Sequence, residues 1–212
     1  LVKSILSELR NMDEAPPFIY ISSAAVYGNP AQQPVAEDSE LAPISPYGEH
    51  RRECEKLIYD YVAETGNSAL ILRAFSLFGP RQKQLVLWEI ARQALMEKQI
   101  SFQGTGQESR DFLSAREFTR RTLRLADLKL PGLHVVNVAS GESLAIETLA
   151  KKIQRQLGIN KPAVSLGKPQ TGNPTHWLAS IDRYQKLTGD LSVADFDGDL
   201  QECLRTWKEE IG

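Results

Sequence analysis

Short apolar runs and longer segments with helical spacing alternate along the chain. Residues 18–22 (FIYIS) and 68–75 (SALILRAF) are apolar, rich in β-branched or aromatic residues, and followed by glycine-containing turns, which is typical of buried strands. Between them, the segment 46–65 follows Ser45-Pro46, a favourable helix start, and stops at Gly66. This order predicts a strand, a helix and a second strand, the unit from which parallel sheets are built.

The rest of the chain continues the alternation. The apolar pattern predicts helices over 1–10, 84–98, 116–127, 143–157 and 182–187, extended chain over 100–114, a strand over 133–138, a short element at 163–166, and a last helix that ends at Trp207. The expected fold class is therefore α/β with a mainly parallel sheet.

Composition and charge narrow the classes of function. The 212 residues are 42% hydrophobic and 25% charged, as in an ordinary globular protein, and the net charge is -2. Because lysine and arginine are dispersed among acidic residues, we expect no nucleic-acid partner. No apolar run approaches the roughly 18 residues of a membrane span, so we expect no membrane partner and a cytoplasmic location.

Cysteine and histidine do not form a metal-binding pattern. Cys54 and Cys203 have neither ligand spacing nor nearby partners, and His50, His134 and His176 share no such spacing either. We therefore expect no metal site.

The most informative chemical pattern joins the end of the first strand to the next helix. Ser23 follows the apolar run 18–22, and Tyr47 and Arg51 lie four residues apart on the helix, which puts their side chains on one face. A free tyrosine has a pKa of about 10, so a tyrosine that acts as a base near neutral pH needs a nearby cation. These residue types in this arrangement indicate a proton-transfer site at the carboxyl end of a strand.

Five stretches of the sequence together resemble one known family. The stretches are ISSAAVYG, SPYGEHRRECEKL, LRAFSLFGPRQ, GTGQESRDF and VVNVASGESLAIETLA, which begin at residues 21, 45, 72, 104 and 135. They are similar to the extended short-chain dehydrogenase/reductase family, in its NAD-dependent nucleotide-sugar epimerase/dehydratase branch. The resemblance implies the C-terminal part of a Rossmann-type doubly wound parallel sheet, plus a smaller mixed α/β substrate-binding domain.

The same resemblance suggests roles for individual residues. It implies that Ser23, Tyr47 and Arg51 are catalytic, with tyrosine as the acid and base, and that Tyr47 and Arg51 also hold the cofactor. Ala74 and Phe75 match positions near the nicotinamide. Two substrate-binding residues are also implied, namely Ser76, where the family has asparagine, and Arg110, whose guanidinium would bind a diphosphate.

Several positions depart from the family pattern. Arg51 replaces a lysine, and its planar guanidinium is not equivalent to an ammonium at a site that needs close placement. The segment 170–173 (QTGN) resembles a family R-x-G-D stretch without its charges. These exchanges suggest an altered substrate or decayed activity.

Three functions remain open on this evidence. Ala24 and Ala25 stand where family dehydratases carry an Asp-Glu pair, and alanine supplies neither an acid nor a base, so a 4,6-dehydratase is disfavoured. The leading hypothesis is an NAD(P)-dependent nucleotide-sugar epimerase. The alternatives are an NADPH-dependent nucleotide keto-sugar reductase, and a truncated, catalytically silent binding or assembly module.

The resemblance also implies a domain organisation, a cofactor and partners. Residues 1–82 correspond to the second part of the dinucleotide-binding domain, and 83–212 mainly to the substrate-binding domain, with 133–157 returning to the Rossmann sheet. The chain starts with Leu1 in a helical pattern and holds no dinucleotide fingerprint, so we expect it to be a fragment that binds NAD or NADP only with an N-terminal part. The expected partners are a nucleotide-diphosphate sugar and a second copy, in a homodimer formed through the helix that carries Tyr47.

Overall fold

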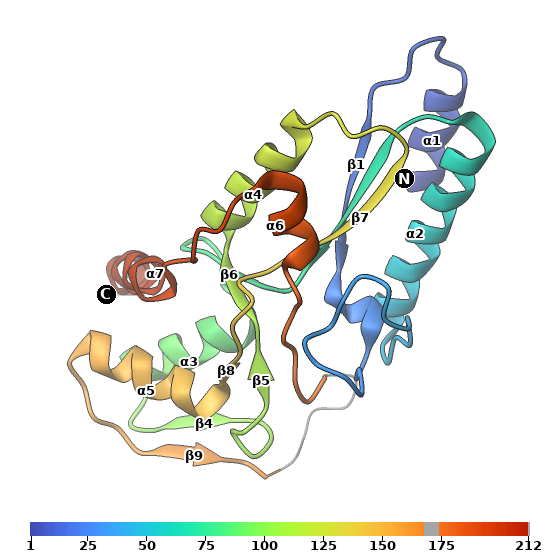
Figure 1. Ribbon diagram of the computed structural model, residues 1–212. Helices are drawn as coiled ribbons and strands as arrows, with labels where there is room; N and C mark the ends of the chain where they lie inside the picture. The colour runs from blue at the N-terminus through green and yellow to red at the C-terminus, as the bar shows by residue number, and fades with distance from the viewer. Residues whose placement is uncertain (168–173, 212) are drawn as a thin grey trace.

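A parallel three-stranded sheet forms one half of the molecule (Figure 1). The computed structural model describes residues 1–167 and 174–211. Within them, strands β1 (Phe18–Ser23), β2 (Ala69–Ala74) and β7 (Leu133–Val138) pair in the order β1-β2-β7, all parallel. The predicted α/β class with a parallel sheet is confirmed.

Helices cover both faces of this sheet. Helices α1 (Val2–Arg10) and α2 (Pro46–Thr65) pack on one face around a core that includes Leu6, Ile58 and Ile71. Helices α4 (Ala115–Asp127) and α6 (Asp182–Thr188) lie on the other face (Figure 1). The sheet is therefore doubly wound, as expected.

The predicted boundaries of α2 agree with its caps. The hydroxyl of Ser45 accepts a hydrogen bond from the backbone N–H of Gly48 at 3.1 Å, and Pro46 occupies the first helical position. Gly66 ends the helix with φ of 70°, a left-handed conformation that favours glycine.

The second half of the molecule has its own apolar core. Helices α3 (Leu85–Met96), α5 (Ile146–Leu157) and α7 (Phe196–Ile211) pack together around Trp88, Ile153 and Trp207. Helix α7 continues four residues beyond the predicted end at Trp207, because Ile211 still packs against this core. In the segment 133–157, β7 thus belongs to the sheet, whereas α5 packs in the second core.

Short strands pair across the second half and join it to the first. Strand β3 (Ser76–Phe78) pairs with β6 (Phe112–Ser114), β4 (Ile100–Phe102) pairs with β9 (Ala163–Ser165), and β5 (Ser109–Arg110) pairs with β8 (Leu144–Ala145). Since β3 follows β2 after one residue, the sheet leads directly into the second half.

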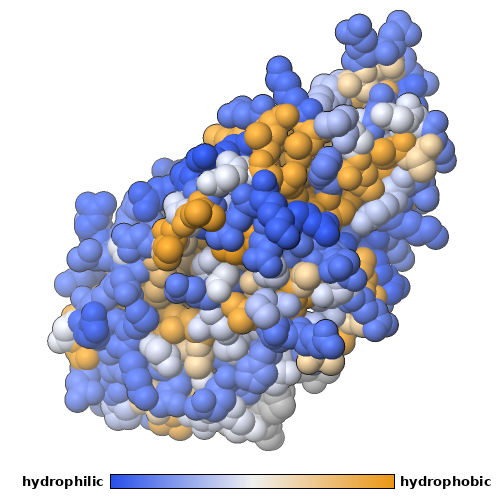
Figure 2. Space-filling model, viewed as in Figure 1, coloured by the Kyte–Doolittle hydropathy of each residue, from blue (hydrophilic) through white to orange (hydrophobic). Residues whose placement is uncertain are grey.

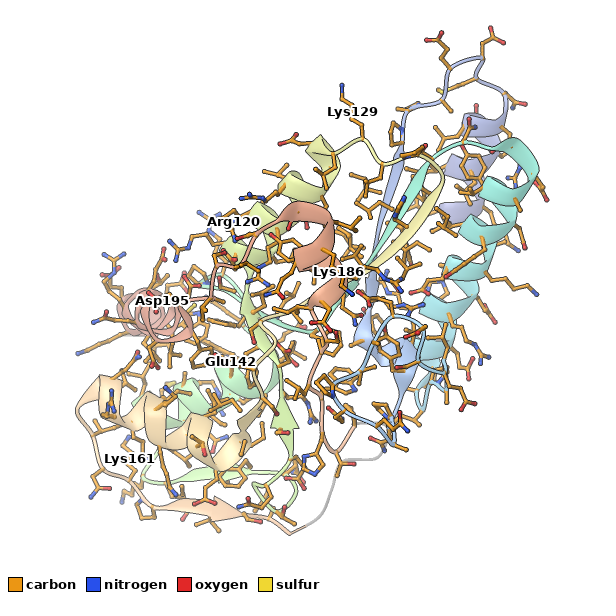
Figure 3. The ribbon with its side chains drawn as sticks, viewed as in Figure 1. Arg120, Lys129, Glu142, Lys161, Lys186 and Asp195 are labelled. Carbon is orange, nitrogen blue, oxygen red and sulfur yellow. The ribbon has the colours of Figure 1, made fainter. Side chains whose placement is uncertain are left out.

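Helices α4 and α6 are joined by a polar contact at the far side of the sheet. Arg120 extends from α4 (Figure 3) and donates hydrogen bonds to Glu117 and to the buried carboxylate of Asp190, at 2.7 and 2.8 Å. Asp190 also accepts a hydrogen bond from the hydroxyl of Tyr184 on α6, at 2.6 Å.

Strand β1 forms one edge of the sheet and leaves apolar side chains uncovered. It pairs with β2 alone among the described strands, and Ile19 and Ile21 are 36% and 49% exposed. They neighbour Leu70 and Leu72 of β2, which the helices of that face cover. Figure 2 shows apolar surface over the strands beside α6.

No helix among the described residues is both long enough and apolar enough to span a membrane.

Candidate active site

The carboxyl end of β1 carries the first candidate residue, Ser23. The strand passes directly into a short 3-10 helix, η1 (Ala24–Tyr27), and the Ser23 hydroxyl caps it by accepting a hydrogen bond from the backbone N–H of Ala25 at 3.2 Å. Within the residues that the structure describes, the Ser23 hydroxyl donates no hydrogen bond. This half-buried O–H can therefore donate to a ligand.

Tyr47 and Arg51 lie together on the first turns of α2, as their spacing predicts. The guanidinium carbon of Arg51 is 4.9 Å from the ring centroid of Tyr47, a cation–π distance. The phenol of Tyr47 is 52% exposed, so it is open to a ligand.

A glycine brings the start of α2 close to η1. A Cβ atom added at Gly48 would lie 2.5 Å from the carbonyl oxygen of Ala25 and 2.9 Å from Cβ of Pro43. Only a residue without a side chain fits there. The residue after Tyr47 therefore touches the turn that Ser23 caps, which holds the two candidate residues in the same region.

Arg51 is anchored by strand β1. Its Nη1 donates to the hydroxyl of Tyr20 at 3.0 Å and to the carbonyl of Ile21 at 3.2 Å. Burial alone lowers the pKa of Arg51, but the hydrogen bond to Tyr20 and the proximity of Tyr47 raise it overall. Burial raises the pKa of Tyr20 to about 12, although the hydrogen bond from Arg51 opposes this shift. The guanidinium therefore stays charged.

A buried polar cluster lies beneath this site. Ser22, Arg73 and Asn137 occupy adjacent positions in β1, β2 and β7, in register across the sheet. Arg73 forms a bidentate ion pair with Glu55 of α2, at 3.1 and 2.8 Å, and Ser22 donates to the same carboxylate at 2.5 Å. Burial would lower the pKa of Arg73, but its bonds to Glu55 raise it overall. The cluster ties α2 to the sheet.

The cluster continues to the turn that follows Ser23. The hydroxyl of Tyr27 donates to the side-chain oxygen of Asn137 at 2.7 Å and accepts from Arg73 at 2.9 Å. Burial raises the pKa of Tyr27 to about 12, so it remains a neutral donor. The backbone N–H of Asn137 also donates to the buried carboxylate of Glu37 at 2.9 Å.

Ala74, Phe75 and Ser76 lie at the carboxyl end of β2 and link the two halves. Ala74 pairs with Ser23 in the register, which places it beside the candidate site. The buried ring of Phe75 lies 6.3 Å from the ring of Tyr27. Ser76 begins β3, and its backbone N–H donates to the carbonyl of Asp111 at 2.9 Å.

Arg110 lies on β5 and reaches the same region through Trp177. Its guanidinium carbon is 5.7 Å from the Trp177 ring, and its Nη1 donates to the carbonyls of Ser109 and Thr175 at 2.9 and 3.3 Å. The indole N–H of Trp177 donates to the carbonyl of Gly28, directly after η1, at 3.1 Å. Burial lowers the pKa of Arg110.

A surface hollow lies at the start of α2, close to the candidate residues. Its lining includes Ser45, Pro46 and His50, but neither Tyr47 nor Arg51. The described residues contain no group of three potential metal ligands. The uncharged segment 170–173 lies outside the described residues.

Sequence reasoning missed Tyr20 and the buried cluster. Tyr20 lies within the apolar run of β1 and nothing in the pattern distinguishes it from a core residue. Arg73 did give a signal, because it is the only charge in the apolar strand 69–74, and a buried charge requires a partner. Its partner Glu55 is distant in sequence and looked like one more acidic residue on a helix.

Comparison with known proteins gives a consistent picture. A family model described as the NAD dependent epimerase/dehydratase family matches residues 1–139. A Bacillus subtilis protein named an uncharacterised UDP-glucose epimerase is 30% identical over 172 residues, 80% of this chain and 54% of that protein. The UDP-glucose 4-epimerase of Azospirillum brasilense is 26% identical over 91% of this chain and 61% of its own length.

Solved structures agree with these relatives. The UDP-glucuronic acid 4-epimerase of Bacillus cereus, in complex with UDP-glucuronic acid and NAD, has a TM-score of 0.91 and 25% identity, and covers 99% of this chain. The UDP-N-acetylglucosamine 4-epimerase of Methanobrevibacter ruminantium has a TM-score of 0.89 and 26% identity over 99% of this chain. The chain spans 66% and 68% of these two structures, and between about half and two thirds of the curated relatives.

Proposed function

Because the chain belongs to the NAD-dependent epimerase/dehydratase family, we propose that it carries the proton-transfer half of an NAD(P)-dependent nucleotide-sugar 4-epimerase. The observation that carries this proposal is the cation–π contact on α2, where the guanidinium carbon of Arg51 lies 4.9 Å from the ring centroid of Tyr47. The start of the same helix touches the turn that Ser23 caps. Three of the similar proteins are named as 4-epimerases of UDP-sugars, which supports the substrate class.

In this proposal Tyr47 removes the proton from a sugar hydroxyl and returns it. Arg51, whose guanidinium carbon lies 4.9 Å from the ring centroid of Tyr47, stabilises the phenolate that forms, since a nearby positive charge favours the charged state of a phenol. Ser23 donates a hydrogen bond to the same sugar oxygen and orients it, while keeping its own proton. Ala24 and Ala25 supply no acid or base beside this pair, so loss of water from the sugar is not assisted there.

The residues present also fit a nicotinamide cofactor. The Nε atom of Arg51 is buried and has no hydrogen-bond partner within the described ranges, so a donor remains for a ligand oxygen such as a ribose hydroxyl. Ala74 and Phe75, at the end of β2, would line the nicotinamide side. When bound, the cofactor would supply reversible hydride transfer.

Two further parts of the proposal concern the substrate phosphates and the assembly. Arg110, already held against Trp177, would pair with the diphosphate, and Ser76 would lie nearby. The chain would form a homodimer through α2 and α1, where Ile5 of α1 is 37% exposed on the surface.

The experiment is an epimerisation assay on the intact natural protein, supplied with NAD and UDP-hexoses. Replacing Tyr47 by phenylalanine removes only the hydroxyl and should lower kcat by about 10²–10⁴-fold, the usual contribution of a general acid–base group. Tyr59→Phe, an exposed tyrosine on the same helix, is the matched control and should keep full activity. If Tyr47→Phe left every detectable reaction unchanged, the proposed role of Tyr47 would be wrong.

A further inference from the structure

Tyr20 is a second tyrosine that contacts Arg51, in addition to Tyr47. Its ring lies 5.8 Å from the guanidinium carbon, and its hydroxyl accepts the hydrogen bond from Nη1 at 3.0 Å. Tyr20 is 8% exposed, on the sheet face that packs against α2. The guanidinium is therefore flanked by two phenol rings, one buried and one open.

Such a support matters more for arginine than for lysine. The sequence resembles a family that has lysine at position 51, a flexible stem that ends in a compact ammonium. Arginine is longer, and its donors point in fixed directions in one plane, so its orientation must be set by contacts. Here the contacts are the Tyr20 hydroxyl and the Ile21 carbonyl, both made by Nη1.

The anchored end of the guanidinium determines where the rest of it points. With Nη1 engaged by β1, the Nε–H is left buried beside Tyr47 and has no partner among the residues described. A guanidinium without the Tyr20 contact could turn this donor away, and catalytic groups misplaced by about 1 Å can lose about 10²-fold in rate.

We propose that Tyr20 is a positioning residue that holds the guanidinium of Arg51 against Tyr47. The arginine can then stabilise the Tyr47 phenolate at a position where the family has lysine. The inference rests on the proposed function of the Tyr47 site. It assigns the Tyr20 hydroxyl a role beyond packing, because the ring alone would fill the same space in the core.

A double-mutant cycle separates the hydroxyl from the ring. In the intact natural protein, Tyr20→Phe should lower kcat/KM by about 10-fold, as expected for loss of one hydrogen bond to a charged group. In the Arg51→Lys background the same change should lower it less than about 3-fold, because the contact is already absent. Tyr59→Phe is the control for loss of a phenol from the same region. An equal effect of Tyr20→Phe in both backgrounds, or a gain in activity, would overturn the proposal.

A second measurement needs no turnover. With ¹⁵N-labelled arginine, the Nε–H signal of Arg51 is identified as the one that Arg51→Lys removes. Its hydrogen exchange should be slow in the wild type and faster by about 10-fold in Tyr20→Phe, since the Ile21 carbonyl is then the one anchor of Nη1 that remains of the two described. Unchanged exchange would show that Tyr20 does not hold Arg51. If the wild type shows the slow exchange and the acceleration but turns over no nucleotide sugar, the positioning stands and the proposed function fails.

Discussion

The buried ion pair between Arg73 and Glu55 should be the most sensitive link between α2 and the sheet. Replacing Glu55 by alanine leaves the guanidinium of Arg73 buried without its carboxylate, and the hydroxyl of Ser22 loses its acceptor. The side chains of Arg73 and Glu55 are 2% and 1% exposed, so water cannot replace the lost partner. Both Tyr47 and Arg51 lie on the helix that this pair holds.

The burial of the pair sets the expected magnitude. Breaking a fully buried pair by removing one partner destabilises a protein by about 3–5 kcal/mol. An exposed pair contributes about 0–1 kcal/mol. The pair Arg52–Glu49 on the same helix is of the second kind, with side chains that are both 45% exposed. Glu49→Ala is therefore the matched control, because it also removes a glutamate of α2 that pairs with an arginine, but leaves that arginine exposed to water.

Urea unfolding followed by circular dichroism measures both changes. At an m-value of about 2–3 kcal/mol/M, Glu55→Ala should lower the midpoint by about 1–2 M, and Glu49→Ala by less than about 0.5 M. The double variant Arg73→Met, Glu55→Leu should lose less than Glu55→Ala alone, because no unpaired charge remains. Equal losses for Glu55→Ala and Glu49→Ala would refute the argument.

Three further perturbations test other parts of the structure. Gly48→Ala should lower epimerase kcat by about 10-fold or more, because its Cβ would meet the carbonyl of Ala25 and displace Tyr47. Burial raises the pKa of Asp190, but hydrogen bonds from Tyr184 and its neighbours lower it overall. The ionised carboxylate should therefore stabilise the folded state above pH about 4, and this contribution should be lost at lower pH. Asp190→Asn should flatten that part of a plot of Tm against pH. Trp207→Phe should destabilise by about 1–3 kcal/mol in urea unfolding, less than Trp207→Ala, because phenylalanine keeps an aromatic ring in the core, whereas both changes remove an indole N–H that is buried without a partner in the part of the chain described here.

Matched variants give each of these tests a clear outcome. Glu53→Ala, exposed on α2, should leave kcat unchanged, and a fully active Gly48→Ala would contradict the close approach to η1. Asp13→Asn, at an exposed position, should keep the acid limb of the Tm curve, and an unaltered limb in Asp190→Asn would mean that other groups produce it. Equal losses for phenylalanine and alanine at Trp207 would mean that a phenyl ring at this position does not pack in the core.

Local chemistry made much of the fold predictable. Ser45 and Gly66 mark the ends of α2 by capping preferences that depend on a few neighbouring residues. The apolar runs predicted β1 and β2 to within a residue or two, because both strands are continuous in hydrophobicity. The expectation of a buried strand is confirmed for β2, but it is wrong for one face of β1, where Ile19 and Ile21 are exposed. The shared face of Tyr47 and Arg51 followed from helical geometry alone.

Contacts between segments that are distant in sequence could not be predicted from the pattern of residues. Tyr20 and Arg51 are 31 residues apart, and Trp177 reaches Gly28 across 149 residues. Periodicity describes one element at a time, so it cannot show which polar side chains of two elements meet. Arg73 was the exception in principle, because a charge inside an apolar strand signals a partner without naming it.

The open edge at β1 has a practical consequence for anyone who produces these 212 residues alone. Among the described strands β1 pairs with β2 alone, so its other edge, beside the exposed Ile19 and Ile21, is a template onto which another strand can add, as in an aggregating sheet. Self-association that grows with concentration on size-exclusion chromatography is the expected behaviour. Ile21→Lys would place a charge on this edge strand and should reduce the self-association.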